Sequence, residues 1–351
     1  MNTFLVLSEY TKDSFIRNLF KKRGNWQMKE KGKVDFLFIQ GDRLSRERRF
    51  WNQRAFIKNR IDLDTIIISQ KNQVYKKVDK QLRDKYLLAQ KSIKLGPSFR
   101  CSNYKSFIEK YPITILKPIY GYAGKHISTV EDYEDFKKII KPILEEKKAD
   151  NWSDRKMKKY DYIKRLNWVL EEYILDPYLY KKKKFHFRPY FIYYHSKEEN
   201  KAFLYNKFRI AVADQNYVSG DFKNKDIHDT HFTANEKTEA IYLDDFLSRK
   251  NYNIIVEQLI ELFTNISKNL SVKCYPENDI CLQIFAADVM ITKNIQIKLI
   301  EINTNPGFIS DRFLKLNTAG HILENIMYHI IDPIFPPKNK INDPEGFIKL
   351  I

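Results

Sequence analysis

Two β-rich runs joined by a short polar turn near residue 293 constrain this chain more than any other part of its sequence. The second run ends in IEINTNPGF, where the polar side chains of Glu301 and Asn303 stand two positions apart beside isoleucines. A third polar residue, Asp288, interrupts the first run, FAADVMI. A hairpin that must bury its apolar residues while holding these oxygen-bearing side chains suggests that they share a ligand.

The register of this hairpin decides whether the three side chains meet. We expect a two-residue turn at Lys293 and Asn294, which places Asp288 opposite Leu299 and diagonal to Glu301, at roughly 7–8 Å between backbone positions. Side chains alternate along a strand, and a turn one residue longer or shorter would reverse the faces. One face is then expected to carry Leu299, Glu301 and Asn303, and the other Lys298, Ile300 and Ile302.

Two carboxylates and one amide are too few to enclose a metal ion by themselves. They suit Mg²⁺, which prefers oxygen ligands, retains water and takes further oxygens from nucleotide phosphates. The sequence therefore predicts a Mg²⁺ site at Asp288, Glu301 and Asn303. The alternative is a solvated edge strand, which fits an isolated acid better than acids flanked by isoleucine, alanine and leucine.

The composition places the chain among folded, basic proteins. Its 351 residues exceed the usual size of one domain, and 43% hydrophobic and 14% aromatic residues exclude a disordered chain. Lys and Arg number 62 against 44 Asp and Glu, a formal charge of +18, which favours an acidic protein segment, nucleic acid or an anionic membrane as partner. An AT-biased genome also raises the lysine content, so charge alone does not choose among these.

Cysteine usage and hydropathy indicate the compartment. Cys101, Cys274 and Cys281 form no CxxC pair, and their odd number argues against a disulfide framework, so we expect a reducing, cytoplasmic location. The first residues lack a basic leader, and no window approaches the ~20 apolar residues of a membrane span. We expect a soluble protein without a membrane partner.

Hydrophobic periodicity predicts alternating strands and helices without an internal repeat. In the first part we expect strands at 3–8, 34–41 and 64–69 around a helix that buries Ile16, Leu19 and Phe20, then a helix over 79–95 and a strand at 113–118. A helix over 130–148 should be kinked or split by Pro142, and the polar run 150–159 reads as a mobile loop. Further on we expect strands in 167–174, 184–194 and 202–212, a helix over 252–270, the hairpin 281–303, a helix over 319–332 and a Pro-rich tail.

Basic residues gather at the ends of several predicted strands. Lys117 ends one strand and is followed by a glycine-bearing turn with Gly124 and Lys125, which could approach a phosphate closely, although it is no Walker loop. In KFHFR, a period of two separates a basic face from a phenylalanine face that needs burial. Arg209, within an apolar run, needs an anionic partner. His228 and His231 lack a third ligand and read as an ordinary loop.

The order of these parts resembles a known group of enzymes. LKPIYGYAGKHI, VLEEYI, KFHFR, THFTANE and FAADVMI…KLIEINTNPGF follow one another as in the ATP-grasp superfamily and, within it, the tubulin tyrosine ligase-like family. The resemblance implies an α/β (α+β) ATP-grasp fold with the nucleotide in the cleft between its last two domains. The expected parts are an N-terminal α/β domain (1–80), a central domain (81–172), a C-terminal domain (173–337) and a tail (338–351).

The resemblance also implies roles for individual residues, with ATP and Mg²⁺ as cofactors. Catalysis is expected of Lys184, Arg188 and Arg209, the last as partner of the substrate amino acid's carboxylate, and metal binding of Asp288, Glu301 and Asn303. His186 stands where the family has Asp, and the family's HLTN reads HFTA here. The residues expected to bind ATP are Lys117, Gly124, Lys125, the hinge Glu171, Glu172, Tyr173 and Ile174, then Lys184, His186 and Thr233.

We therefore expect an ATP-dependent carboxylate-amine ligase that adds a free amino acid to an acidic protein segment, such as a tubulin tail, through an acyl phosphate. One alternative is a ligase for small amino acids or peptides, because the EINTNPGF motif also resembles the end motif of D-alanine ligases. The other is a catalytically degenerate, basic protein that binds nucleic acid, which is possible but not favoured.

Overall fold

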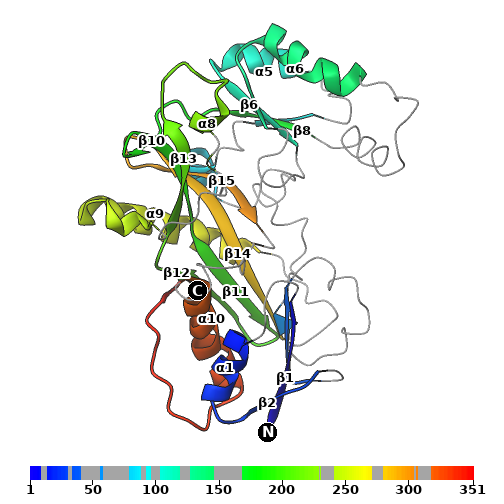
Figure 1. Ribbon diagram of the computed structural model, residues 1–351, viewed down its shortest axis with the longest axis vertical. Coiled ribbons are helices and arrows are strands. Elements are labelled where there is room, and N and C mark those ends of the chain that lie inside the picture. Colours follow the sequence, from blue (N-terminus) through cyan, green and yellow to red (C-terminus); the bar gives the residue numbers. More distant parts are fainter. Residues whose placement is uncertain are drawn as a thin grey trace.

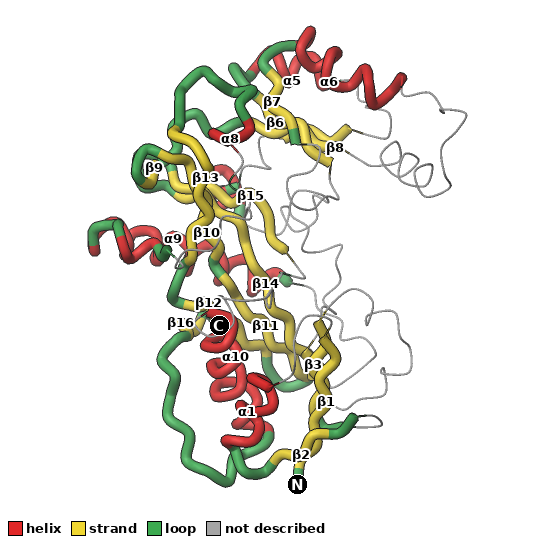
Figure 2. Tube along the Cα trace, viewed as in Figure 1, coloured by secondary structure: helices red, strands yellow, loops and turns green. Residues whose placement is uncertain are grey.

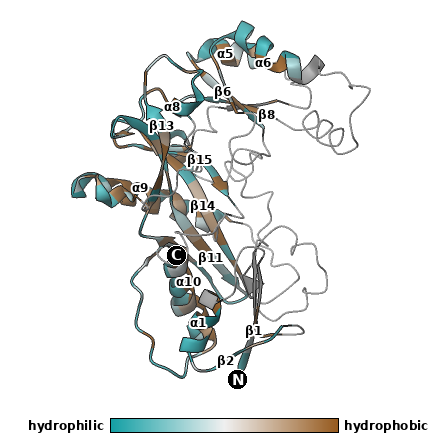
Figure 3. Ribbon diagram, in the orientation of Figure 1, coloured by the Kyte–Doolittle hydropathy of each residue, from teal (hydrophilic) through white to brown (hydrophobic). Residues whose placement is uncertain are grey.

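A long mixed β-sheet and a smaller antiparallel sheet organise the chain. The computed structural model describes residues 1–8, 14–30, 34–40, 56–57, 79–87, 92–95, 103–118, 127–145, 168–228, 230, 241–270, 280–303, 306 and 318–351. The smaller sheet lies with α5 and α6 at one end of the molecule, and α1 and α10 lie at the other (Figure 1). Figure 3 shows that hydrophobic residues concentrate along the strands of the long sheet.

The N-terminal strands extend the long sheet with parallel pairs. β1 (Asn2–Ser8) lies between β2 (Trp26–Met28) and β3 (Phe36–Gln40), and β4 (Phe56–Ile57) joins β3 to β14. Helix α1 (Ser14–Lys22) buries Ile16, Leu19 and Phe20, so the predicted strands at 3–8 and 34–41 and the helix between them are confirmed. The predicted strand at 64–69 lies outside the described residues.

The remaining strands of the long sheet pair antiparallel. The predicted runs 184–194 and 202–212 are each two strands, because Pro189 and the segment 206–208 end the first of each pair. The predicted tail contributes β16, which pairs with β12. These strands are β9 (Leu179–Tyr180), β10 (Lys183–Arg188), β11 (Tyr190–Ser196), β12 (Asn200–Tyr205), β13 (Arg209–Asn216), β14 (Ile280–Ile291), β15 (Ile297–Asn303) and β16 (Phe347–Lys349).

Helices cover both faces of the long sheet (Figure 2). Helix α9 (Arg249–Asn269) starts at Ser248, whose Oγ accepts a hydrogen bond from the Asn251 amide, and it buries Ile255, Leu259 and Phe263 against the core, as predicted for 252–270. The predicted last helix is α10 (Gly320–Ile326), a π-helical turn (Met327–Ile331) and α11 (Asp332–Ile334). The short helices α8 (Lys225–His228) and η5 (Leu243–Asp245) lie between β13 and α9.

The smaller sheet corrects one expectation from the sequence and narrows another. Its order is β5 (Ser92–Leu95), β8 (Trp168–Glu172), β6 (Thr114–Pro118) and β7 (Ser128–Val130), flanked by α5 (Tyr104–Lys110) and α6 (Tyr133–Glu145). The helix predicted over 79–95 is wrong beyond α4 (Lys80–Tyr86), because residues 92–95 pair with β8 and this pairing overrides helix propensity. Helix α6 runs through Pro142 without a split, and the kink that was the other expected outcome stays a prediction.

Three further expectations concern a loop, the domain boundaries and membrane spans. The loop predicted at 150–159 lies outside the described residues, and the domain boundaries at residues 80, 172 and 337 stay predictions. In the described part of the chain, no helix combines the length and the hydropathy needed to cross a membrane.

Candidate active site

The hairpin of β14 and β15 turns over three residues, so the predicted two-residue turn is wrong. Ile291 lies opposite Ile297, and the Thr292 amide donates to the Gln296 carbonyl at 2.9 Å. The third turn residue, Ile295, has a φ of 57°, the left-handed conformation typical of the last position in three-residue loops. The added residue shifts the expected register by one.

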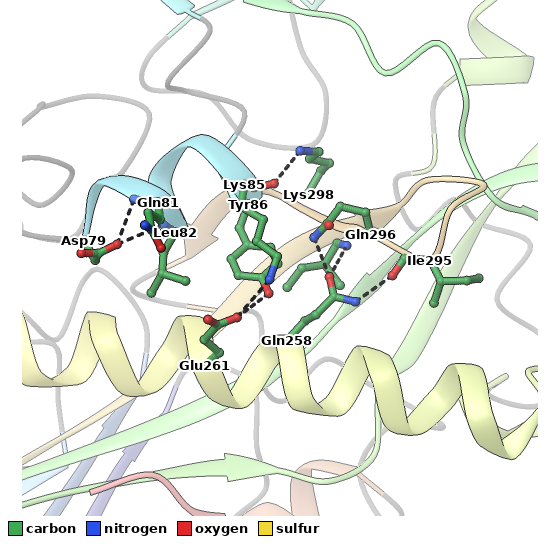
Figure 4. Close-up of polar contacts among 11 residues, drawn as sticks. Asp79, Gln81, Leu82, Lys85, Tyr86, Gln258, Glu261, Ile295, Gln296 and Lys298 are labelled. Atoms are coloured by element: carbon green, nitrogen blue, oxygen red, sulfur yellow. Dashed lines mark hydrogen bonds and ion pairs between the residues drawn. The ribbon is translucent and has the colours of Figure 1, made fainter.

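Helix α9 holds this turn through Gln258 (Figure 4). The Nε2 atom of Gln258 donates a hydrogen bond to the Ile295 carbonyl at 2.7 Å. The Oε1 atom of Gln258 accepts hydrogen bonds from the Ile297 amide at 3.1 Å and from Gln296 Nε2 at 2.6 Å. The free edge of β15 is covered by the end of α4, where Leu87 bridges to Leu299. The unusual turn is therefore fixed by tertiary contacts.

A β-bulge at Ile300 shifts the register again. Val289 lies opposite Leu299, but Asp288 lies opposite Glu301, so Ile300 is the extra residue. The predicted faces are wrong on two points: Leu299 packs with Ile302 in the core under α9, and Ile300 packs beside Met290 on the other face. Glu301 and Asn303 do share a face with Asp288, whose Oδ2 accepts from Asn303 Nδ2 at 3.2 Å.

The carboxylates of the buried Asp288 and the half-buried Glu301 lie together beside a guanidinium. Arg188 binds Asp288 through two hydrogen bonds of 2.7 and 3.0 Å. Burial alone would raise the pKa of Asp288, but Arg188 and His186 lower it below its ordinary value. Burial and the charge of Asp288 both raise the pKa of Glu301, so this pair needs additional positive charge to ionise fully.

The predicted basic face of β10 is confirmed, with Phe185 and Phe187 buried on the opposite side. Lys184 is 5% exposed, and its Nζ donates to the Tyr173 hydroxyl at 3.0 Å. Burial lowers the pKa of Lys184 to about 7. His186 lies next along this face, with Nδ1 at 2.7 Å from Thr230 Oγ1 and Nε2 at 3.7 Å from Asp288 Oδ1.

The smaller sheet faces these strands with a second buried ion pair. Lys117 on β6 lies 2.7 Å from Glu171 on β8. Burial would lower the pKa of Lys117, but the carboxylates of Glu171 and Glu301 outweigh it, so the pKa is raised and the amine stays charged. Glu171 Oε1 is buried and has no hydrogen-bond partner among the described residues. It is a free acceptor at the cavity wall.

A cavity of about 150 Å³ lies between the two sheets. Lys117 and Glu171 line one side, and Lys184, Asp288 and Glu301 line the other. The apolar residues Ile174, Met290 and Ile300 form a separate small cluster at this cavity. The cavity thus has an apolar cluster and, in its wall, a hydrogen-bond acceptor without a partner in the described part of the chain, together with lysines and the paired carboxylates.

A larger cavity of about 350 Å³ adjoins the first and shares Lys184 with it. Its wall includes the aromatic residues Tyr173 and Phe222 and the basic residues Lys223 and Lys225. His228, expected in an ordinary loop, instead ends helix α8 and lines both cavities. Nothing in the sequence alone joined this residue to β8 or β10.

The structure thus brings together most of the predicted site residues, whose roles stay predictions. Glu172 and Ile174 line the smaller cavity and Tyr173 the larger one. Arg209 is the cross-strand neighbour of Arg188 and lines neither cavity. Gly124, Lys125 and Thr233 lie outside the described residues. Sequence reasoning missed Ile115 and Met290, although a period of two places them with Lys117 and Asp288.

The residues present fit a nucleotide with Mg²⁺. Glu171 Oε1 can accept from an exocyclic amino group, and the apolar cluster suits a flat base. Two paired carboxylates with the Asn303 amide suit an ion that takes its other oxygens from phosphate and water. Among the described residues no three His, Cys, Asp or Glu side chains are arranged as a complete metal site.

Comparison with solved structures identifies the fold of the chain. The C-terminal domain of Pby1 from K. lactis, described as an ATP-grasp enzyme interacting with the mRNA decapping enzyme Dcp2, matches with a TM-score of 0.62 and 16% identity over 99% of this chain and 98% of that one. The chain thus has the mixed α/β ATP-grasp fold predicted from its sequence.

The family follows from a second comparison. Residues 54–253 and 242–342 match the Tubulin-tyrosine ligase family. The chain belongs to this family, which confirms the resemblance seen in the sequence. A search of curated protein sequences gives no match. Family and fold together support an ATP-grasp ligase.

Proposed function

We propose that this protein is an ATP- and Mg²⁺-dependent carboxylate-amine ligase that adds an amino acid to an acidic protein segment such as a tubulin tail. One observation carries the proposal: Lys117 and Lys184, from two facing sheets, line the same cavity as Asp288 and Glu301. This arrangement suits the phosphates of a nucleotide, and the family supports a ligase.

The chemical problem of such a reaction is to bring a carboxylate to the γ-phosphate, anion against anion. Lys117 and Lys184 would offset the phosphate charge, and Arg188 would stabilise the reacting oxygens. The carboxylate attacks the γ-phosphate to give an acyl phosphate and ADP, and an amine then displaces phosphate and forms an amide bond. Mg²⁺ held by Asp288, Glu301 and Asn303 would neutralise and orient the phosphates.

The choice of an acidic protein acceptor rests on the charge of the chain. A formal charge of +18 attracts acidic segments over long range and raises their rate of encounter. Arg209, beside Arg188 on the neighbouring strand, would bind the carboxylate of the amino acid. A cytoplasmic location would give the enzyme access to tubulin.

Intact-mass spectrometry tests this proposal directly. Tubulin is incubated with the protein, Mg-ATP and labelled Tyr, Glu or Gly, and the added mass identifies the transferred group. Glu301→Gln should abolish transfer and ADP release, whereas Glu257→Gln, on the exposed surface of α9, should retain both. Transfer by the Glu301→Gln variant would contradict the metal assignment, and no transfer by the wild type would contradict the acceptor.

The larger cavity favours a second candidate function. Its volume of about 350 Å³ suits a small amino acid or peptide bound beside the nucleotide. ADP release provoked by free amino acids without a protein acceptor would select this candidate. The nucleic-acid alternative is the weakest of the three, because one cavity is lined by two lysines predicted to bind phosphate, Lys117 and Lys184, and by two predicted metal ligands, Asp288 and Glu301. Salt-dependent RNA binding without Mg-ATP binding would favour it.

A further inference from the structure

Lys184 is connected to helix α8 by a continuous chain of hydrogen bonds. Its Nζ donates to the Tyr173 hydroxyl at 3.0 Å and lies 4.3 Å from the centre of that ring. The same hydroxyl lies 2.6 Å from His228 Nδ1. His228 Nε2 lies 2.7 Å from the Asp221 carbonyl oxygen. The chain therefore begins at the wall shared by both cavities and ends on the backbone.

The chemistry of these groups fixes the direction of each bond. A carbonyl oxygen only accepts, so Nε2 of His228 carries the proton, and in a neutral ring Nδ1 must then accept. Burial lowers the pKa of His228, which favours this neutral ring. The Tyr173 hydroxyl donates to His228, and its oxygen is left to accept from the ammonium group of Lys184. His228 thus helps to set which way the hydroxyl points, together with Tyr217, whose side chain also interacts with Tyr173.

The ring of His228 is held by its neighbours and by contacts to the smaller sheet. Phe222 stacks on it at 6.0 Å between centroids, and Tyr217 meets it edge-on at 5.9 Å. The Phe222 carbonyl accepts from Thr129 Oγ1 at 2.6 Å, and Lys223 pairs with Asp135 on α6. Residues 221–228 therefore contact both sheets.

We propose that His228 is a positioning residue for nucleotide binding, which acts by orienting the Tyr173 hydroxyl so that it holds the Lys184 ammonium group toward the cavity. This inference rests on the proposed function of the cleft. In the described part of the chain, Lys184 Nζ has no hydrogen-bond partner other than Tyr173. Its remaining N–H groups are thus available to a phosphate.

The protein contains a matched arrangement away from the cleft. The Tyr205 hydroxyl lies 3.0 Å from His321 Nδ1, and His321 Nε2 lies 2.7 Å from the Pro344 carbonyl oxygen. Tyrosine, histidine and carbonyl follow in the same order, but neither cavity includes these residues. Variants of this pair measure what the loss of such a chain does to stability alone.

A double-mutant cycle on the full chain tests the proposal. We expect His228→Phe to weaken binding of a non-hydrolysable ATP analogue with Mg²⁺ by about three- to tenfold, the equivalent of one hydrogen bond. In the Lys184→Met background the same substitution should change affinity less than twofold. Tyr173→Phe, which removes only the hydroxyl, should repeat the effect if His228→Phe folds poorly.

The pH profile separates positioning from a general loss of structure. Without His228, the Tyr173 hydroxyl is no longer held with its oxygen toward Lys184, so the charged form of Lys184 is less stable. The analogue affinity of His228→Phe should therefore begin to fall at a lower pH than that of the wild type. His321→Phe and Tyr205→Phe should lower the melting temperature without shifting this profile. The titratable groups along the larger cavity are Tyr173, His228, Asp135, Lys223 and Lys225, and Tyr217 lies beside Tyr173. Those that line the smaller cavity with Lys184 are Lys117, Glu171, Glu172, His186, Asp288 and Glu301.

The possible results distinguish a failure of the positioning role of His228 from a failure of the proposed function. A His228→Phe effect of the same size with and without Lys184 would overturn the positioning role, as would an equal loss of affinity in His321→Phe. If the wild type binds the analogue and His228→Phe binds it equally well, this inference alone fails. If the wild type does not bind it, the proposed function fails as well.

Discussion

The guanidinium of Arg188 lies side-on against the carboxylate of Asp288, with Nε 2.7 Å from Oδ1 and Nη2 3.0 Å from Oδ2. Both oxygens belong to a carboxylate that we propose as a Mg²⁺ ligand. Arg188 therefore neutralises Asp288 while no divalent cation is bound. An exchange between a guanidinium and a metal ion at one carboxylate leads to the first prediction.

Arg188→Met should make the stability of the protein depend on Mg²⁺. Loss of the guanidinium leaves the buried Asp288 carboxylate unpaired beside the half-buried Glu301, which should cost about 3 kcal/mol in free energy of unfolding without divalent ions. Millimolar Mg²⁺ should restore much of this loss, so the rise in melting temperature on adding Mg²⁺ should exceed that of the wild type. Arg249→Met, at an exposed site on α9, is the control, and an equal rise in all three proteins would exclude a metal at Asp288.

Glu301→Gln should be at least as stable as the wild type at neutral pH, and the difference should depend on pH. The folded pKa of Glu301 is raised by burial and by Asp288, so its stabilising contribution is present below the unfolded value of 4.5 and lost as pH rises through the folded pKa. The advantage of Glu301→Gln should therefore grow from pH 4.5 upward in denaturant titrations. A difference that stays constant over this range would contradict the raised pKa.

The charge of Lys184 should control the pH dependence of nucleotide affinity. With a pKa of about 7, the free protein loses this positive charge between pH 6 and pH 8. Binding of an anion then requires proton uptake, and the affinity for Mg-ATP analogue should fall by at most about tenfold per pH unit above 7. Lys184→Arg, which stays charged, should flatten the profile in calorimetric titrations; an unchanged slope would show that another group titrates.

Gln258→Leu should loosen the hairpin that carries the acids. Its amide makes three hydrogen bonds to the turn (Figure 4), and their loss should lower the free energy of unfolding by about 2 kcal/mol. Mg²⁺ should also stabilise this variant less than the wild type, because Asp288 and Glu301 lose their fixed register. The same change at the exposed Gln81 of α4 should have neither effect in thermal melts.

The hairpin shows what the sequence could and could not predict. Alternation predicted that Asp288 and Glu301 share one face, and they do. The predicted turn length was wrong, however, and the bulge in β15 was not predicted. The three-residue turn alone would have put them on opposite faces, and the bulge at Ile300 restores the match. The two offsets of one residue add up to two, and a shift by an even number of residues leaves each side chain on the same face.

Elsewhere in the chain, the sequence did not predict contacts between segments that are distant in sequence. The basic face of β10 followed from a period of two within one strand. His228 did not, because its partner Tyr173 lies 55 residues away in sequence. The sequence of residues 92–95 is typical of a helix end, but these residues form a strand because they pair with β8, which lies more than 70 residues further along the chain. Local pattern predicts elements and faces, and it does not predict which faces meet.

The paired offsets in the hairpin carry an evolutionary consequence. A relative that shortened the turn by one residue without losing the bulge would direct its acid at 301 into the core under α9. Insertions and deletions between these two strands should therefore be inherited in even numbers, or as one change in the turn matched by one in the strand. An alignment of homologues that places gaps singly in this segment would be misaligned there.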